Sequence, residues 1–240
     1  MIPFSLVSEI ERYIDGICYQ DPYSALSPDG FYRINNLYVD SPDFKFYNTR
    51  LQGIGNRFNM RIRAYGENPK APYFFEVKHK DQGYIKKYRA KSKVSDIPGF
   101  MDQRRSETDP SPNADLFLRL ALTYNVEPKI FNFYYRKAYI SKLDDYARIT
   151  FDRNLGFQRE TEYRLCPGES ATNYDNSFIF PLGCDIILEL KAERRVPCWI
   201  IDLIKNFGLE RGSFSKYSNS VKHVFDDQFF PKIDHKSFLD

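Results

Sequence analysis

The sequence has few of the residues that mark a metal or disulfide framework. Its 240 residues include four cysteines, which are widely scattered and never paired at the C-x-x-C spacing of a zinc knuckle. Because the chain is large and has only four cysteines, we expect these cysteines to be reduced, buried thiols. No apolar stretch is long enough to span a bilayer, and the first residues lack the basic start and apolar core of a signal peptide. We therefore expect a cytoplasmic protein without a membrane segment.

The sequence also lacks a phosphate-binding loop and a strong net charge. Gly53-Ile54-Gly55-Asn56 has neither the lysine nor the following helix of a P-loop, so we interpret it as a turn. The formal net charge is only +3, which indicates little about binding partners. The positions of the charges along the chain are more informative than their sum.

Aromatic residues make up 17% of the chain, and many short runs of Tyr, Phe, Ile and Val favour strands. Strands are predicted at 31–40, 58–65, 73–80, 84–91, 130–141, 147–151, 158–165 and 184–191. Helices are predicted near 3–14, 44–51, 114–124 and 197–207, the third of them capped by Asn113. The stretches 96–112 and 166–183 are predicted to be irregular, and a single domain is expected over residues 1–240.

Charged residues alternate along the predicted strands, which places them on one face of each strand. The rows are Arg61 and Arg63; Glu76, Lys78 and Lys80; Lys87, Arg89 and Lys91; Arg148, Thr150 and Asp152; Glu160, Glu162 and Arg164; and Glu189 and Lys191. On any single strand, an antiparallel sheet with one solvated face gives the same alternation. Recurring rows of like charge repel one another, however, and indicate an anionic partner.

If such a sheet closes into a barrel, its charged faces turn inward and helices cover its apolar faces. The predicted fold class is therefore α+β: an antiparallel β-barrel, or tunnel, of about eight strands with flanking helices. In a lumen of this kind, guanidinium groups bind phosphate strongly and often through two hydrogen bonds. Glu76 and Glu189, with Glu162 or Asp152 as further candidates, would suit Mn²⁺ or Mg²⁺ bound together with phosphates.

Seven short motifs follow one another in a specific order along the chain. They are Tyr32–Asp43, Arg61–Gly66, Phe75–Lys80, Tyr135-Arg136, Arg148–Asp152, Leu188–Lys191 and Phe214–Tyr217. Each motif alone is weak, but the ordered set covers nearly the whole chain and resembles the VTC domain of polyphosphate polymerases. That family belongs to the triphosphate tunnel metalloenzymes, which are related to the CYTH proteins.

The resemblance implies a tunnel that binds a nucleoside triphosphate such as ATP and transfers its terminal phosphate to polyphosphate or pyrophosphate. The phosphate-binding residues are then expected to be Arg61, Arg63, Lys78, Lys87, Arg89, Arg136, Arg148 and Lys216. Catalytic roles are expected for Arg63, Arg136 and Glu189, and metal binding for Glu189 and Glu76. Lys80, Lys91 and Lys191 are expected as neighbours in the lumen.

The front of the chain departs from the family. Its members usually begin with a strand carrying an R-x-E-x-K-type pattern, whereas Glu9-Ile10-Glu11-Arg12 falls at helical spacing. The domain is therefore expected to lack that first strand, with its natural start upstream of Met1.

Alternatives to a polymerase stay open. One is a triphosphatase, in which water replaces the polyphosphate acceptor, and another is a non-catalytic module that binds polyphosphate or inositol phosphates. Nucleic acid is a less suitable partner, because the basic residues alternate on strands rather than forming a helix or an aromatic RNA-binding platform.

Overall fold

An antiparallel sheet forms the centre of the chain. The computed structural model describes residues 1–67, 72–93, 97–102, 111–144, 146–166, 168, 171–173 and 184–225. The strands are β1 (Cys18–Gln20), β2 (Tyr32–Asp40), β3 (Arg57–Tyr65), β4 (Tyr73–Asp81), β5 (Tyr84–Ser92), β6 (Glu127–Ser141), β7 (Ala147–Arg159), β8 (Thr172–Asn173) and β9 (Ile187–Ala192). Their order is β5-β4-β3-β2-β6-β7-β8, with β1 paired to β6 and β9 paired to β7.

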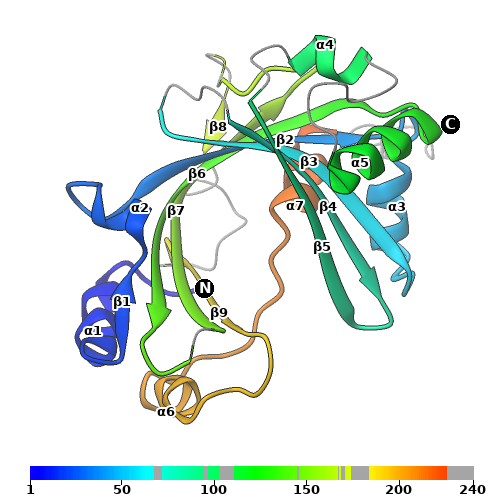
Figure 1. Cartoon of the computed structure of the whole chain (residues 1–240). Helices are drawn as coiled ribbons and strands as arrows, with labels where there is room; N and C mark the ends of the chain where they lie inside the picture. Colours follow the sequence, from blue (N-terminus) through cyan, green and yellow to red (C-terminus); the bar gives the residue numbers. More distant parts are fainter. Residues whose placement is uncertain are drawn as a thin grey trace, which may run out of the picture.

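The sheet curls into an arch. β4 and β5 form one side of it, and β9 with the adjoining ends of β6 and β7 forms the other (Figure 1). The register of β6 with β7 shifts between Phe133 and Tyr135, and Asn154 in β7 takes a left-handed φ of 51°. Irregularities of this kind bend strands, so they account for the turn of β6 and β7. The prediction of an antiparallel α+β barrel with flanking helices is confirmed, in the form of a curled half-barrel.

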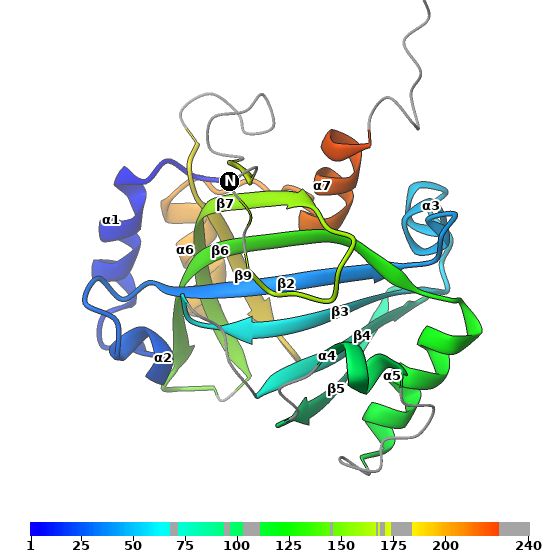
Figure 2. The ribbon, with the colours of Figure 1, turned by 90° about the horizontal axis from the view of Figure 1, so that it is seen from above.

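Helices cover both faces of the arch. They are α1 (Ser5–Ile14), α2 (Pro22–Ala25), α3 (Lys45–Leu51), α4 (Ile97–Asp102), α5 (Pro112–Thr123), α6 (Cys198–Asn206) and α7 (Lys216–Val224). Figures 1 and 2 show α1 and α6 outside one leg of the arch and α5 outside the other. α7 lies beneath the arch, where it contacts β6 and β7. None of the described helices is both long and apolar enough to cross a membrane.

Strand alternation separates an apolar outer face from a charged inner face. On β4, Phe75 packs outward against Phe100 of α4 and Phe117 of α5, with ring centroids 4.2 and 5.2 Å away. On the other leg, Phe151 of β7 lies in one apolar cluster with Leu203 of α6. Each buried large apolar side chain contributes about 1.5–3 kcal/mol. These outer layers hold the arch together and leave its inner face to charged groups.

The cap of α5 is Ser111 rather than the predicted Asn113. The Ser111 hydroxyl accepts a hydrogen bond from the backbone N–H of Ala114, and Pro112 takes the first helical position. The Asn113 amide donates instead to the backbone carbonyl of Arg89 on β5. Asn113 therefore ties the helix to the sheet.

One strand, β7, replaces the two strands predicted at 147–151 and 158–165. It ends at Arg159 because the buried Glu160 carboxylate accepts hydrogen bonds from the backbone N–H groups of Thr161 and Glu162 and turns the chain. The predicted row of Glu160, Glu162 and Arg164 is therefore wrong. These residues lie in a loop, where Arg164 pairs with Glu160 at 2.7 Å, so Glu162 is not part of the inner face.

Other expectations also need correction. The sequence patterns do not predict β1, α2 or α7. α4 and β8 lie inside the stretches 96–112 and 166–183, which are predicted to be irregular. Residues 96, 103–110, 167, 169–170 and 174–183 of the predicted irregular stretches lie outside the described residues. All four cysteines are free thiols as predicted, but Cys166 and Cys198 are exposed rather than buried.

Candidate phosphate-binding site

Five charged side chains gather on the inner face of β3, β4 and β5. This set, the Glu76 group, consists of Glu76, Arg61, Arg63, Lys87 and Arg89. The Glu76 side chain is 1% exposed, and its oxygens lie 2.7 Å from Arg61, 4.0 Å from Arg63, 2.6 Å from Lys87 and 3.1 Å from Arg89. Burial raises the pKa of Glu76, but the surrounding cations outweigh burial and hold that pKa well below its ordinary value. Four cations thus share one carboxylate.

A second set lies on the opposite leg. This Asp152 group consists of Asp152, Glu189, Arg136, Lys191 and Lys216. Arg136 binds both carboxylate oxygens of the buried Asp152, through Nε at 2.7 Å and Nη2 at 2.8 Å. The Lys216 ammonium donates to the same carboxylate at 2.8 Å. Glu189 lies 3.7 Å from Arg136 and 3.2 Å from Lys191.

Arg63 and Tyr134 connect the two groups. The Arg63 Nε donates to the side-chain oxygen of Asn36 at 2.9 Å, which orients the guanidinium plane, and its Nη2 donates to the Tyr134 hydroxyl at 3.4 Å. Arg136 and Lys216 lie 5.3 and 4.4 Å from the centroid of the Tyr134 ring. Burial raises the pKa of Tyr134, but these cations outweigh burial and lower it. The arch therefore presents one continuous basic surface.

The two legs of the arch are within electrostatic reach of each other. Burial and Arg61 lower the pKa of Lys78 on β4, and Glu189 on β9 opposes that shift. With Lys78 added, eight basic side chains face three carboxylates across the two groups. Repulsion among these basic side chains raises the electrostatic energy of the site unless an anion is bound. The geometry therefore suits a polyanion that neutralises it.

The structure brings most of the predicted phosphate-binding residues together. Arg61, Arg63, Lys87 and Arg89 belong to the Glu76 group, Arg136 and Lys216 belong to the Asp152 group, and Lys78 lies beside Glu76. Arg148 is exposed, four residues from Asp152 on β7, and pairs in register with Lys191 of the Asp152 group. It therefore lies at the edge of that group. Lys80 and Lys91 lie on β4 and β5 beyond the Glu76 group and are rim positions.

The carboxylates differ in their ability to bind a metal. Glu76 and Asp152 are buried and held by cations, whereas the Glu189 side chain is 42% exposed. Within the described residues, no three His, Cys, Asp or Glu side chains are close enough together to hold a metal. Mg²⁺ and similar ions commonly bind through one or two carboxylates plus substrate phosphates. The residues therefore fit a divalent ion held by Glu189 and by phosphate oxygens, and they do not favour Glu76 as a ligand.

We expect the affinity for inorganic tripolyphosphate to fall as the pH rises above 8. Burial and the nearby arginines lower the pKa of Lys87 to about 8, although Glu76 opposes the shift. Lys87 is charged below that pH, and a bound polyanion favours the charged form, so deprotonation weakens binding. The affinity is expected to fall about tenfold per pH unit above 8, over the pH range in which Lys87 is deprotonated in the free protein but protonated in the complex.

Titration calorimetry from pH 7 to 10 measures this effect. Lys87→Arg keeps its charge throughout and should show a flat profile. Equal losses in the wild type and in Lys87→Arg would show that another group titrates.

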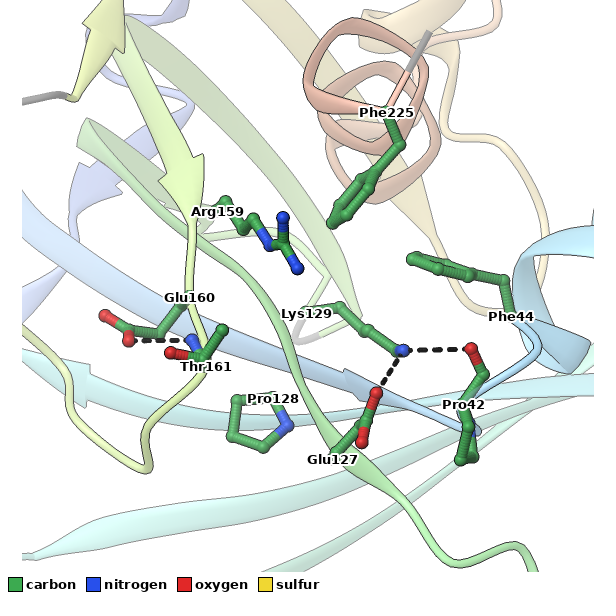
Figure 3. A pocket seen from close by; sticks show the side chains of 9 residues that line it. All are labelled: Pro42, Phe44, Glu127, Pro128, Lys129, Arg159, Glu160, Thr161 and Phe225. Atoms are coloured by element: carbon green, nitrogen blue, oxygen red, sulfur yellow. Dashed lines mark hydrogen bonds and ion pairs between the residues drawn. The ribbon is translucent and has the colours of Figure 1, made fainter. Parts of the chain in front are cut away.

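α7 packs on the inner face at Tyr38 of β2. Tyr217 of α7 stacks on Tyr38 with ring centroids 4.9 Å apart, and its hydroxyl donates to the buried Asp40 carboxylate at 2.7 Å. Beyond it lies a cavity of about 270 Å³, lined by Pro42, Phe44, Glu127, Pro128, Lys129, Arg159, Glu160, Thr161 and Phe225 (Figure 3). Lys129 in this cavity is already bound to the Glu127 carboxylate and the Pro42 carbonyl. This cavity is therefore a poorer anion site than the arch.

Sequence reasoning missed part of the site. Asp152 entered only as a further metal candidate, whereas it is the carboxylate that aligns Arg136 and Lys216. Asn36 and Tyr134, which orient Arg63, were not singled out. The two adjacent asparagines inside the apolar strand Tyr32–Asp40 could have indicated this role, because buried side-chain amides almost always have hydrogen-bond partners.

Comparison with known proteins identifies the family of this chain and one solved structure of similar fold. The crystal structure of a "putative adenylate cyclase" from Bacillus halodurans superposes with a TM-score of 0.51 at 13% identity, covering 91% of this chain and 92% of that one. A protein from Pyrococcus horikoshii gives a TM-score of 0.43 at 11% identity over 90% of this chain and 92% of that one. At such identities the first likeness supports the fold alone. No curated protein matches the sequence significantly. Residues 1–225 match the VTC domain, and the chain therefore belongs to the VTC domain family.

Proposed function

We propose that this domain is a metal-dependent phosphotransferase of the polyphosphate polymerase type. It would transfer the terminal phosphate of ATP to polyphosphate or pyrophosphate. The observation that carries the proposal is the excess of cations on the inner face of the arch, where four of them share the single carboxylate of Glu76. A polyanion laid along the arch would relieve their mutual repulsion.

Positioning and charge neutralisation are the work that the protein must supply. Phosphoryl transfer passes through a transition state whose charge is spread over the phosphate oxygens, so no protein nucleophile is needed. Arg63 and Arg136 hold fixed orientations, through Asn36 and Asp152 respectively, and can each present two N–H groups to a phosphate. The acceptor is then a phosphate oxygen of the second polyanion, held in line by the same basic surface.

Mn²⁺ or Mg²⁺ would be held by Glu189 together with the substrate. When bound, the ion supplies further neutralisation of the charge that develops on the transferred phosphate. Lys191 pairs with Glu189 at 3.2 Å. Burial raises the pKa of Glu189, but Lys191 and Arg136 outweigh burial and lower it, so the carboxylate is ionised at neutral pH.

Product analysis tests the proposal. The protein is incubated with ATP and Mn²⁺, with and without pyrophosphate as primer, and long-chain polyphosphate, free phosphate and cyclic AMP are each measured. Polyphosphate supports the polymerase. Free phosphate alone would indicate a triphosphatase. Cyclic AMP would indicate an adenylate cyclase, the activity by which the Bacillus halodurans protein is described. Binding without turnover would indicate a polyphosphate-binding module.

Glu189→Gln is expected to lower metal-dependent turnover by about 100-fold or more, because an electrostatic contact to the reacting phosphates is lost. Binding of tripolyphosphate in the absence of a divalent metal should be nearly unchanged, since the basic residues remain. Glu193→Gln, an exposed residue just after β9, is the matched control and should keep full activity. Full turnover in Glu189→Gln would exclude this carboxylate as the metal ligand.

The cytoplasmic location remains a prediction, and fractionation of the source cells tests it.

A further inference from the structure

Four aromatic rings form a stack at one end of the arch. The aromatic stack consists of Tyr23 of α2, Tyr32 of β2, Tyr65 of β3 and Phe74 of β4. Tyr23 and Tyr65 lie nearly parallel, with ring centroids 5.5 Å apart and an interplanar angle of 12°. Tyr32 lies 5.6 Å from Tyr23, and Phe74 meets Tyr65 edge-on at 5.5 Å.

The aromatic stack adjoins the basic surface. Arg89 of the Glu76 group donates a hydrogen bond to the Tyr65 hydroxyl at 2.8 Å and lies 3.9 Å above the Phe74 ring. Tyr32 pairs in register with Arg136 of the Asp152 group. A ligand that follows the basic residues toward this end of the arch therefore meets aromatic rings next.

The aromatic stack lies away from the contact that Tyr217 of α7 makes with Tyr38. Tyr38, on which α7 packs through Tyr217, is six residues from Tyr32 on β2, a separation of about 20 Å along the strand. The start of α7 lies nearer to the stack, because Lys216 binds Asp152, which pairs with Arg136 next to Tyr32.

Tyr23 is exposed yet held in place. Tyr23 is 54% exposed, which is the largest exposed fraction among the four residues of the stack. The Asp21 side chain accepts a hydrogen bond from the Tyr23 backbone N–H, and the buried Ser24 hydroxyl accepts one from the backbone N–H of Ala138 on β6. The short helix is therefore fixed to the sheet, and Tyr23 stays more than half exposed in that fixed position.

We propose that Tyr23 and the aromatic stack seat the base of a nucleoside triphosphate whose phosphates lie on the Glu76 and Asp152 groups. This inference rests on the proposed function and adds a base-binding site to it. Stacking on aromatic side chains tolerates any base, because every base has a π-face. The site would therefore separate nucleotides from inorganic tripolyphosphate while discriminating weakly among bases.

Paired titrations test the base site. Dissociation constants for ATP, GTP and inorganic tripolyphosphate are measured for the wild type, Tyr23→Ala, Tyr23→Phe and Tyr84→Ala. Tyr84 is an exposed tyrosine at the turn between β4 and β5 and serves as the matched control. Loss of one base–aromatic contact is expected to weaken ATP and GTP by about tenfold, within a range of about 5- to 150-fold.

Tripolyphosphate binding should be unchanged in Tyr23→Ala, and Tyr23→Phe and Tyr84→Ala should bind ATP as the wild type does. If ATP binding does not respond to Tyr23→Ala, or if tripolyphosphate weakens equally, the base site is overturned and the phosphate site stands. If the wild type binds neither ATP nor tripolyphosphate, the proposed function fails and the base site fails with it.

Discussion

Glu76→Ala is expected to lower the free energy of unfolding by about 3 kcal/mol. The substitution leaves Arg61, Arg63, Lys87 and Arg89 without the carboxylate that they share. Breaking a buried ion pair by removing one partner costs about 3–5 kcal/mol, and the partial exposure of Lys87 and Arg89 places this case at the lower end. Urea denaturation monitored by fluorescence or circular dichroism measures the change.

Two additional measurements tie the loss of stability to repulsion among cations. High salt should restore part of it by screening, and tripolyphosphate should stabilise Glu76→Ala more than the wild type because it replaces the missing negative charge. Glu162→Ala is the control: its side chain is 70% exposed on a loop, and its loss should change stability by less than about 0.5 kcal/mol. A Glu76→Ala protein as stable as the wild type, with no added response to tripolyphosphate, would contradict the assigned role of Glu76.

Arg63→Ala is expected to reduce turnover by about 100- to 1000-fold, the usual cost of removing one pre-oriented donor from a transition state. Arg63 is the member of the Glu76 group that contacts Tyr134 and so approaches the Asp152 group, and the Asn36 oxygen fixes its orientation. The fold should persist, because the apolar outer layers do not involve this side chain. Initial rates of product formation from ATP and Mn²⁺ measure the loss.

Arg63→Lys separates charge from geometry. It keeps one positive charge but cannot make the planar, two-point contact of a guanidinium, so intermediate activity is expected. Arg119→Ala, at an exposed position on α5 outside the arch, should have wild-type activity. If Arg63→Ala turned over at the wild-type rate, the centre of the site would have to be placed elsewhere on the inner face.

Local pattern predicted the strands and the faces that their side chains take, and the structure shows why. Residues two apart on a strand share a face whatever the rest of the chain does, so Arg61 and Arg63 were placed together correctly. The same rule failed at Glu160, Glu162 and Arg164, because the Glu160 carboxylate binds its own backbone and ends the strand. A short polar run can form either a strand or a loop, and here the local hydrogen bonds of Glu160 favour the loop.

The sequence by itself determined that apolar and charged residues would separate to opposite faces of antiparallel strands, and its ordered motifs determined the family. Only the tertiary structure decided which charges meet. Lys216 reaches Asp152 across 64 positions of sequence, and Tyr23 stacks on Tyr65 from a helix that no local pattern predicted. The physical reason is that strand periodicity acts over neighbouring residues. The curl of the sheet and the docking of α2 and α7 depend instead on contacts between distant segments, and these contacts exist only once the chain has folded.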